Sequence, residues 1–186
     1  MLFAMKSINR WKIAGIISIV VLGFLFHYLF SWSDSSKLIG FFAPVNESVW
    51  EHLKLGYWSL VLFSIVEYLN LRKSIHNYYL AKLIGVVVLE LTIIIIYYCY
   101  TFILNKNLFL IDIFSYIMGV VFCQYTIYWL IRLKPFPKAV NKVSLILFVL
   151  IGLMFGITTF YPPRIGLFKD FNSNEYGIKI SQIKLS

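Results

Sequence analysis

One polar segment, "APVNESVWEHLKLGYW" at residues 43–58, lies between two long apolar stretches of the chain. Its two glutamates and its histidine are side chains that bind metal ions or transfer protons. On an ideal helix Glu47 and Glu51 share one face, because they are four residues apart. His52 points about 100° away from Glu51. The three side chains can therefore meet one ion only through a local distortion or with ligands from other helices.

Carboxylate oxygens are the preferred ligands of hard divalent cations. Such an ion would take Glu47 and Glu51 from the polar segment. Asp112 or Asp170 would complete the oxygen ligation.

Imidazole nitrogens favour zinc instead. A zinc ion would take His52 and His27 with one carboxylate of the polar segment, Glu47 or Glu51, and would leave a water to be activated. The chain lacks the H-E-x-x-H spacing of zinc proteases, the G-x-S-x-G nucleophile motif and a glycine-rich phosphate loop. A divalent metal ion is therefore a hypothesis for the cofactor. The sequence does not decide between the carboxylate ligands and the histidine ligands.

The same segment also has the pattern of a helix start. In one register Ser48 is the N-cap and Glu51 completes an S-x-x-E capping box. In the other register Asn46 is the N-cap, and Val45 and Trp50 form a hydrophobic staple. Helix capping explains most of these residues without any ligand.

Further ionisable groups are predicted on the same side of a membrane. His27 lies about 8 Å below the end of the first apolar stretch, and Asp112 begins the fourth. Asp170 follows the last stretch. Glu90 falls near the middle of the third, where a charged group costs roughly 2.5–3.5 kcal/mol to insert. An outward-facing polar cavity would account for all of them; the alternative for Glu90 is a hydrogen bond to a neighbouring helix.

The composition identifies an integral membrane protein. Of 186 residues, 60% are hydrophobic and only 13% are charged, against about 25% charged in soluble domains. This length predicts one all-α transmembrane domain over residues 1–186, with the lipid bilayer as its main partner. The net charge of +9 is attributed to basic loops, and without zinc-finger or RNP-like patterns no nucleic-acid partner is expected.

Five apolar stretches are long enough to cross a bilayer, which needs about 20 helical residues. They are residues 11–32, 49–71, 80–104, 108–131 and 140–161, followed by a tail at 162–186. Three segments are rich in basic residues and contain no acidic residue: Lys6, Arg10 and Lys12; Arg72, Lys73 and Lys82; Arg132, Lys134, Lys138 and Lys142. The positive-inside rule then predicts a cytoplasmic N-terminus and an outer C-terminus.

Three further expectations concern packing. Gly152 and Gly156 form a G-x-x-x-G pattern that lets another helix approach closely. Cys99 and Cys123 are expected at depths about 15 Å apart, which predicts no disulfide. Glu67 is expected to pair with the basic loop that follows its helix.

The stretch "FFAPVNESVWEHLKL" resembles an uncharacterised family of small five-pass bacterial membrane proteins with a PVNESVWEH motif. Other stretches share the resemblance, which covers most of the chain: "HYLFSWS", "VEYLN", "DI" at 112–113 and "TFYPPRIGLFKDFNSNEYGI". The chain departs from the family pattern at Gly166 and Phe171, where prolines are expected. The resemblance implies a helical bundle in the bacterial cytoplasmic membrane with an outward NESVWEH element, and it implies no reaction.

Three function classes remain open. The first is a protein that binds or transports an ion or small solute, with Glu90 as the buried site. The second is a membrane-embedded hydrolase or lipid-modifying enzyme that uses a metal or an acid/base pair around His27 and His52. The third is a non-catalytic subunit or homo-oligomer that docks through Gly152, Gly156 and the basic tail "IKISQIKLS".

Overall fold

The computed structural model describes residues 2–72 and 75–178. In these ranges the chain is helical, with one isolated bridge between Lys169 and Tyr176. The elements are α1 (Leu2–Trp32), α2 (Lys37–Phe42), α3 (Val49–Leu71), α4 (Tyr78–Leu104), α5 (Phe109–Leu130), α6 (Lys138–Phe160) and the 3-10 helix η1 (Gly166–Phe168). The all-helical prediction is confirmed. The short helix α2 was not predicted, and the basic tail at 179–186 lies outside the described residues.

Four helices have the length and apolar composition to cross a membrane: α1 from Ile8, α4, α5 and α6. These helices indicate a membrane protein. α3 occupies the range expected from the sequence but is less apolar, because it carries Glu51, Lys54 and Glu67. The exposed surface of the bundle is rich in large apolar side chains, and Leu110, for example, is 79% exposed. Such a surface suits lipid better than water.

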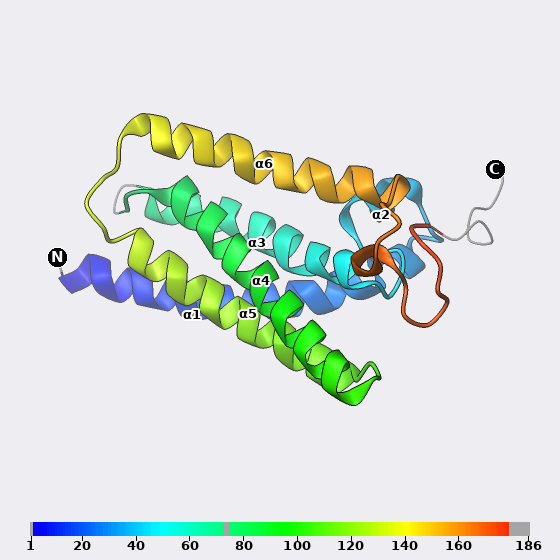
Figure 1. Ribbon diagram of the computed structural model, residues 1–186. Coiled ribbons are helices and arrows are strands. Elements are labelled where there is room, and N and C mark those ends of the chain that lie inside the picture. Colours follow the sequence, from blue (N-terminus) through cyan, green and yellow to red (C-terminus); the bar gives the residue numbers. More distant parts are fainter. Residues whose placement is uncertain (1, 73–74, 179–186) are drawn as a thin grey trace.

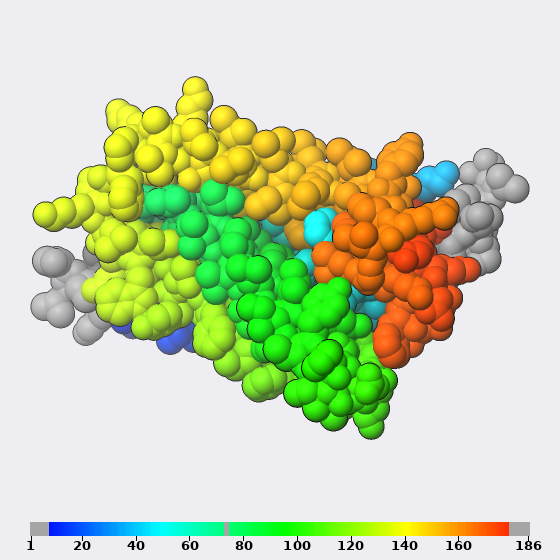
Figure 2. Space-filling model, in the orientation of Figure 1, coloured from blue at the N-terminus to red at the C-terminus, as the bar shows by residue number. Residues whose placement is uncertain are grey.

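The five long helices run in alternating directions, so that α1 begins at one end of the bundle and α6 finishes at the other (Figure 1). α4 packs along α5, and α1 packs against α3 and α5. The α1–α3 connection, which contains α2, and the segment after α6 lie together at one end, called here the α2 end. Figure 2 shows the segment after α6 lying beside the turn between α4 and α5 at this end. Several connections therefore converge there around the start of α3.

The two glycines of the G-x-x-x-G pattern are used within the chain. A Cβ built on Gly152 would lie 2.6 Å from the Tyr57 hydroxyl of α3. A Cβ on Gly156 would lie 2.1 Å from a ring carbon of Phe41 in α2. Both glycines thus let α6 approach its own neighbours, and this face is not free for a partner.

Replacing Gly156 tests this packing. In Gly156→Ala the methyl group overlaps the Phe41 ring, which is itself packed against Phe42 and Trp58. Overpacking costs about 1–3 kcal/mol, and the better helix propensity of alanine offsets about 1 kcal/mol of it. Because the overlap is large, we expect a lower Tm in detergent. Gly166→Ala, whose Cβ meets nothing within 4 Å, is the control and should leave Tm unchanged. Equal Tm values for both variants would contradict the packing shown here.

Candidate functional site

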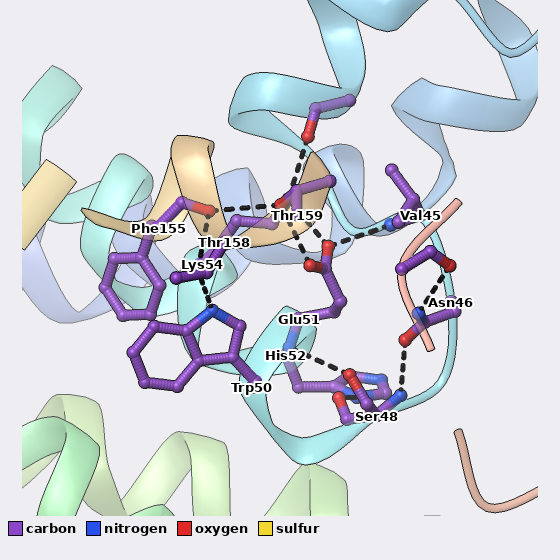
Figure 3. Close-up of polar contacts among 12 residues, drawn as sticks. Val45, Asn46, Ser48, Trp50, Glu51, His52, Lys54, Phe155, Thr158 and Thr159 are labelled. Carbon is purple, nitrogen blue, oxygen red and sulfur yellow. Dashed lines mark hydrogen bonds and ion pairs between the residues drawn. The ribbon is translucent and has the colours of Figure 1, made fainter. Parts of the chain in front are cut away.

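The start of α3 follows the first of the two predicted registers. Ser48 is the N-cap, and its hydroxyl accepts a hydrogen bond of 3.3 Å from the Glu51 N–H. Asn46 lies before the cap, and its side-chain oxygen accepts a bond of 2.9 Å from the Ser48 N–H. The Glu51 carboxylate does not return to the cap, as a capping box requires. It accepts instead from the Val45 N–H at 3.1 Å, as Figure 3 shows.

Glu51 and Lys54 form a buried ion pair of 2.6 Å between their charged atoms. Both side chains are almost completely inaccessible. The Thr159 hydroxyl of α6 lies 2.9 Å from the Glu51 carboxylate and 2.7 Å from the Lys54 ammonium (Figure 3). The Lys54 ammonium also donates to the Gly40 carbonyl of α2 at 2.8 Å. This network, called here the Glu51–Lys54 network, joins α2, α3 and α6.

Glu47 and Glu51 consequently face different surroundings. Because α3 begins at Val49, Glu47 lies outside the helix and does not share a helical face with Glu51. The structure does not bring Glu47 and Glu51 together at one ion. Glu51 is a packing group, whereas the side chain of Glu47 is 47% exposed.

Glu47 meets two histidines from different helices. Its carboxylate lies 3.2 Å from Nε2 of His52 and 4.0 Å from Nε2 of His27. One possible ligand atom from each of the three residues lies within 4.8 Å of the other two. The hydrogen bond from His52 is the largest influence on Glu47, and it lowers the pKa of that carboxyl. These three residues are called here the His–Glu–His cluster.

The two histidines are held in different ways. Nδ1 of His52 lies 2.9 Å from the Ser48 carbonyl, which can only accept, so Nδ1 carries the proton of this bond. Nε2 of His52 is thereby directed at Glu47. The buried Nε2 of His27 has no hydrogen-bond partner in the described part of the chain. Both Nε2 atoms therefore face the space beside Glu47.

The His–Glu–His cluster lines a cavity of about 280 Å³ at the α2 end. Its polar lining also includes Asp112, Asn107 and Asn172. Apolar side chains of α1, α3, α4 and α5 form much of the remaining wall: Phe24, Leu55, Ile93, Phe109 and Ile113. The cavity thus has a polar group of side chains set against an apolar wall.

Two predicted site residues mainly hold the site in place. Asp112 lines the cavity, and it accepts a hydrogen bond of 2.6 Å from the Tyr100 hydroxyl. Asp170 lies in the segment after α6 and accepts from the backbone N–H groups of Asn172 at 2.7 Å and Glu47 at 3.3 Å. Burial disfavours its charge, but backbone hydrogen bonds outweigh burial and lower the pKa of Asp170. Asp170 therefore fixes the backbone of Glu47 and does not join it in the cavity.

Two glutamates lie deeper in the bundle. Both carboxylate oxygens of Glu90 are buried without a hydrogen-bond partner in the described part of the chain. Glu67 forms ion pairs with Lys12 at 2.5 Å and with Lys82 at 2.6 Å. The expected partner of Glu67 was the basic loop after its own helix; the structure pairs Glu67 with two other helices instead, and Lys73 of that loop lies outside the described residues. The sequence showed the three residues but not that their helices are neighbours.

The fold and the cluster define a helical membrane protein with a polar cavity at one end. The chain belongs to a family of unknown function, DUF6512, which it matches over residues 1–178. No curated protein and no solved structure matches the chain. The expected membership of an uncharacterised family is confirmed, and any function must be inferred from the geometry.

Breaking the Glu51–Lys54 network should destabilise the α2 end. Glu51→Gln leaves the Lys54 ammonium buried without its counter-charge, which costs about 3–5 kcal/mol. We expect a marked loss of Tm and of folded yield in detergent. The exposed Glu175→Gln is the control and should behave as wild type. The double variant Glu51→Gln with Lys54→Met has no unpaired charge, so part of the lost stability should return. If its loss of Tm equals the sum of the losses in the two single variants, the pairing is refuted.

Proposed function

We propose that this protein is an integral membrane protein that binds one divalent transition-metal ion, of the zinc class, at the His–Glu–His cluster. Zinc holds nitrogen and oxygen ligands at about 2.0–2.2 Å, so ligand atoms around a tetrahedral ion are about 3.4 Å apart. The two Nε2 atoms lie 3.2 and 4.0 Å from the Glu47 carboxylate, on either side of this value. This convergence of two imidazoles and one carboxylate from separate elements is the observation that carries the proposal.

The groups around the cluster support the same assignment. A histidine that binds a metal commonly donates its other ring nitrogen to a carbonyl, which fixes its tautomer. His52 makes this bond to Ser48. Nε2 of His27 has no hydrogen-bond partner among the described residues, so it is available as the second nitrogen ligand. A metal ion would displace the Nε2 proton of His52, and two neutral imidazoles with one carboxylate then suit a divalent ion without excess charge.

A second candidate is metal-dependent hydrolysis of an amphiphilic substrate. Three protein ligands leave one position of a tetrahedral zinc ion for water, the arrangement of catalytic zinc sites. The cavity beside the cluster has an apolar wall and the additional carboxylate of Asp112. This combination favours an enzyme over a closed structural metal site. The alternative of a docking subunit loses support, because Gly152 and Gly156 pack within the chain.

We propose five membrane crossings, with the α2 end outside the bacterial cytoplasmic membrane. α1 begins and α6 finishes at opposite ends of the bundle, as an odd number of crossings requires (Figure 1). α3 can be the fifth crossing because Glu51, Lys54 and Glu67 are buried in ion pairs and spared from lipid. The positive-inside rule then sets the direction, because the basic loops flank the other end.

Metal analysis tests the cluster. Protein expressed without a polyhistidine tag and loaded with zinc should retain about one ion per chain after gel filtration. His27→Ala and His52→Ala each remove a ligand, so the affinity should fall by more than the about 10–100-fold caused by loss of an outer partner. The control is His76→Ala, which removes the third histidine of the chain, exposed and outside the cluster. Wild-type affinity in both cluster variants would refute the site.

Reporter fusions test the topology. Because α1 starts and α6 ends at opposite ends, a periplasmic alkaline phosphatase fused after residue 178 should be active, and a cytoplasmic fluorescent protein fused there should be dark. The same two reporters placed in the α3–α4 connection should give the reverse result. Activity of the same reporter at both positions would rule out the five-crossing arrangement.

A further inference from the structure

Glu90 differs from the other buried carboxylates described above, which all have partners. It lies in the interior of α4, and neither of its oxygens accepts a hydrogen bond from the described residues. An ionised carboxylate in such a place would lose its hydration without compensation, which costs several kcal/mol. Insertion of such a residue into a membrane usually indicates a function.

Glu90 lies close to residues that line the cavity of the His–Glu–His cluster. Ile93, three residues after Glu90 in α4, lines the cavity. Three residues correspond to a rise of about 4.5 Å along the helix axis. Tyr116 of α5 also lines the cavity and is close enough to Glu90 for their charges to interact. The buried Ser59 hydroxyl of α3 adjoins Tyr116. Tyr116 thus connects the surroundings of Glu90 with the lining of the cavity.

The surroundings of Glu90 suit a proton better than a metal ion. Calcium takes six to eight oxygen ligands and magnesium requires an octahedron. The Tyr116 hydroxyl, which is near Glu90, already donates to the Ile19 carbonyl at 2.8 Å. A proton needs no further ligand and removes the charge of the carboxylate.

We propose that Glu90 is a proton-binding site that exchanges its proton with the cavity at the α2 end, past Tyr116 and Ser59. The proton leaves the carboxylic acid for water in the cavity and returns from it, so no other reactant is required. This exchange is independent of metal binding to the His–Glu–His cluster.

The charges on the other side of Glu90 favour exchange through the cavity. Toward the opposite end lie Lys12 and Lys82, two buried ammonium groups that share one carboxylate, Glu67. Cys123 is close enough to Glu90 and to both lysines for their charges to interact. The titratable neighbours of Glu90 are thus Tyr116 and Cys123 of α5, with the Lys12–Glu67–Lys82 group beyond. The excess positive charge of that group repels a proton that would pass in this direction.

Infrared spectroscopy of the reconstituted protein tests the proposal. The wild type should show a C=O band of a protonated carboxylic acid that Glu90→Gln lacks. The band should shift when H₂O is exchanged for D₂O, because the proton is in contact with the cavity. No difference band between the two proteins, or a difference band that does not shift, overturns the proposal. An apolar carbodiimide, which reacts with the acid form, should label Glu90 in the wild type, and absence of this adduct overturns it without any substitution.

Two tyrosine variants test the route. Tyr116→Phe removes the hydroxyl between the cavity and Glu90 and should slow the D₂O shift. Tyr78→Phe removes a buried hydroxyl beside Glu67, where it lies 3.3 Å from the carboxylate, and should leave the rate unchanged. Slower exchange in Tyr78→Phe with a normal rate in Tyr116→Phe would overturn the route through the cavity. Because Glu90 has no hydrogen bond to lose, Glu90→Gln should keep the Tm of the wild type.

Discussion

The buried Glu51–Lys54 ion pair determines how the α2 end is built. Two charges without water require each other and additional hydrogen bonds, and these come from Thr159 of α6 and the backbone of residues 40 and 45. The pair therefore fixes the rotation of α3 about its axis. His52 follows Glu51 by one residue, about 100° of helical rotation, so directing Glu51 toward α6 directs His52 to the cavity.

A second buried ionic group holds α3 at its other end. Glu67 pairs with Lys12 of α1 and Lys82 of α4, and the Tyr78 hydroxyl lies 3.3 Å from the same carboxylate. The polar residues that make α3 less apolar than its neighbours are thus the groups that attach it to them. A helix with these charges exposed to lipid would be costly. In the interior, the same charges select the partners and the depth of α3.

The sequence predicted the elements better than their contacts. Long apolar stretches locate the five long helices, and the S-x-x-E spacing includes the observed N-cap, Ser48. The partners of Glu67 could not be predicted, because Lys12 and Lys82 are distant in sequence and only packing brings their helices together. The separation of Glu47 from Glu51 depends on where α3 begins, which two capping registers left open. The short helix α2 has too few residues for a periodic pattern.

The three glutamates near the cavity show how surroundings assign different chemistry to one type of side chain. Glu51 is paired with Lys54, and its buried oxygens accept hydrogen bonds from the Val45 N–H and the Thr159 hydroxyl. Glu47, half-exposed beside two imidazoles, keeps its charge and can share it with a cation. Glu90 is buried without a hydrogen-bond partner among the described residues, a setting that penalises the charged form of a carboxyl group. The proposed cation binding at Glu47 and the proposed proton binding at Glu90 therefore use the same type of side chain, and the difference lies in burial and partners.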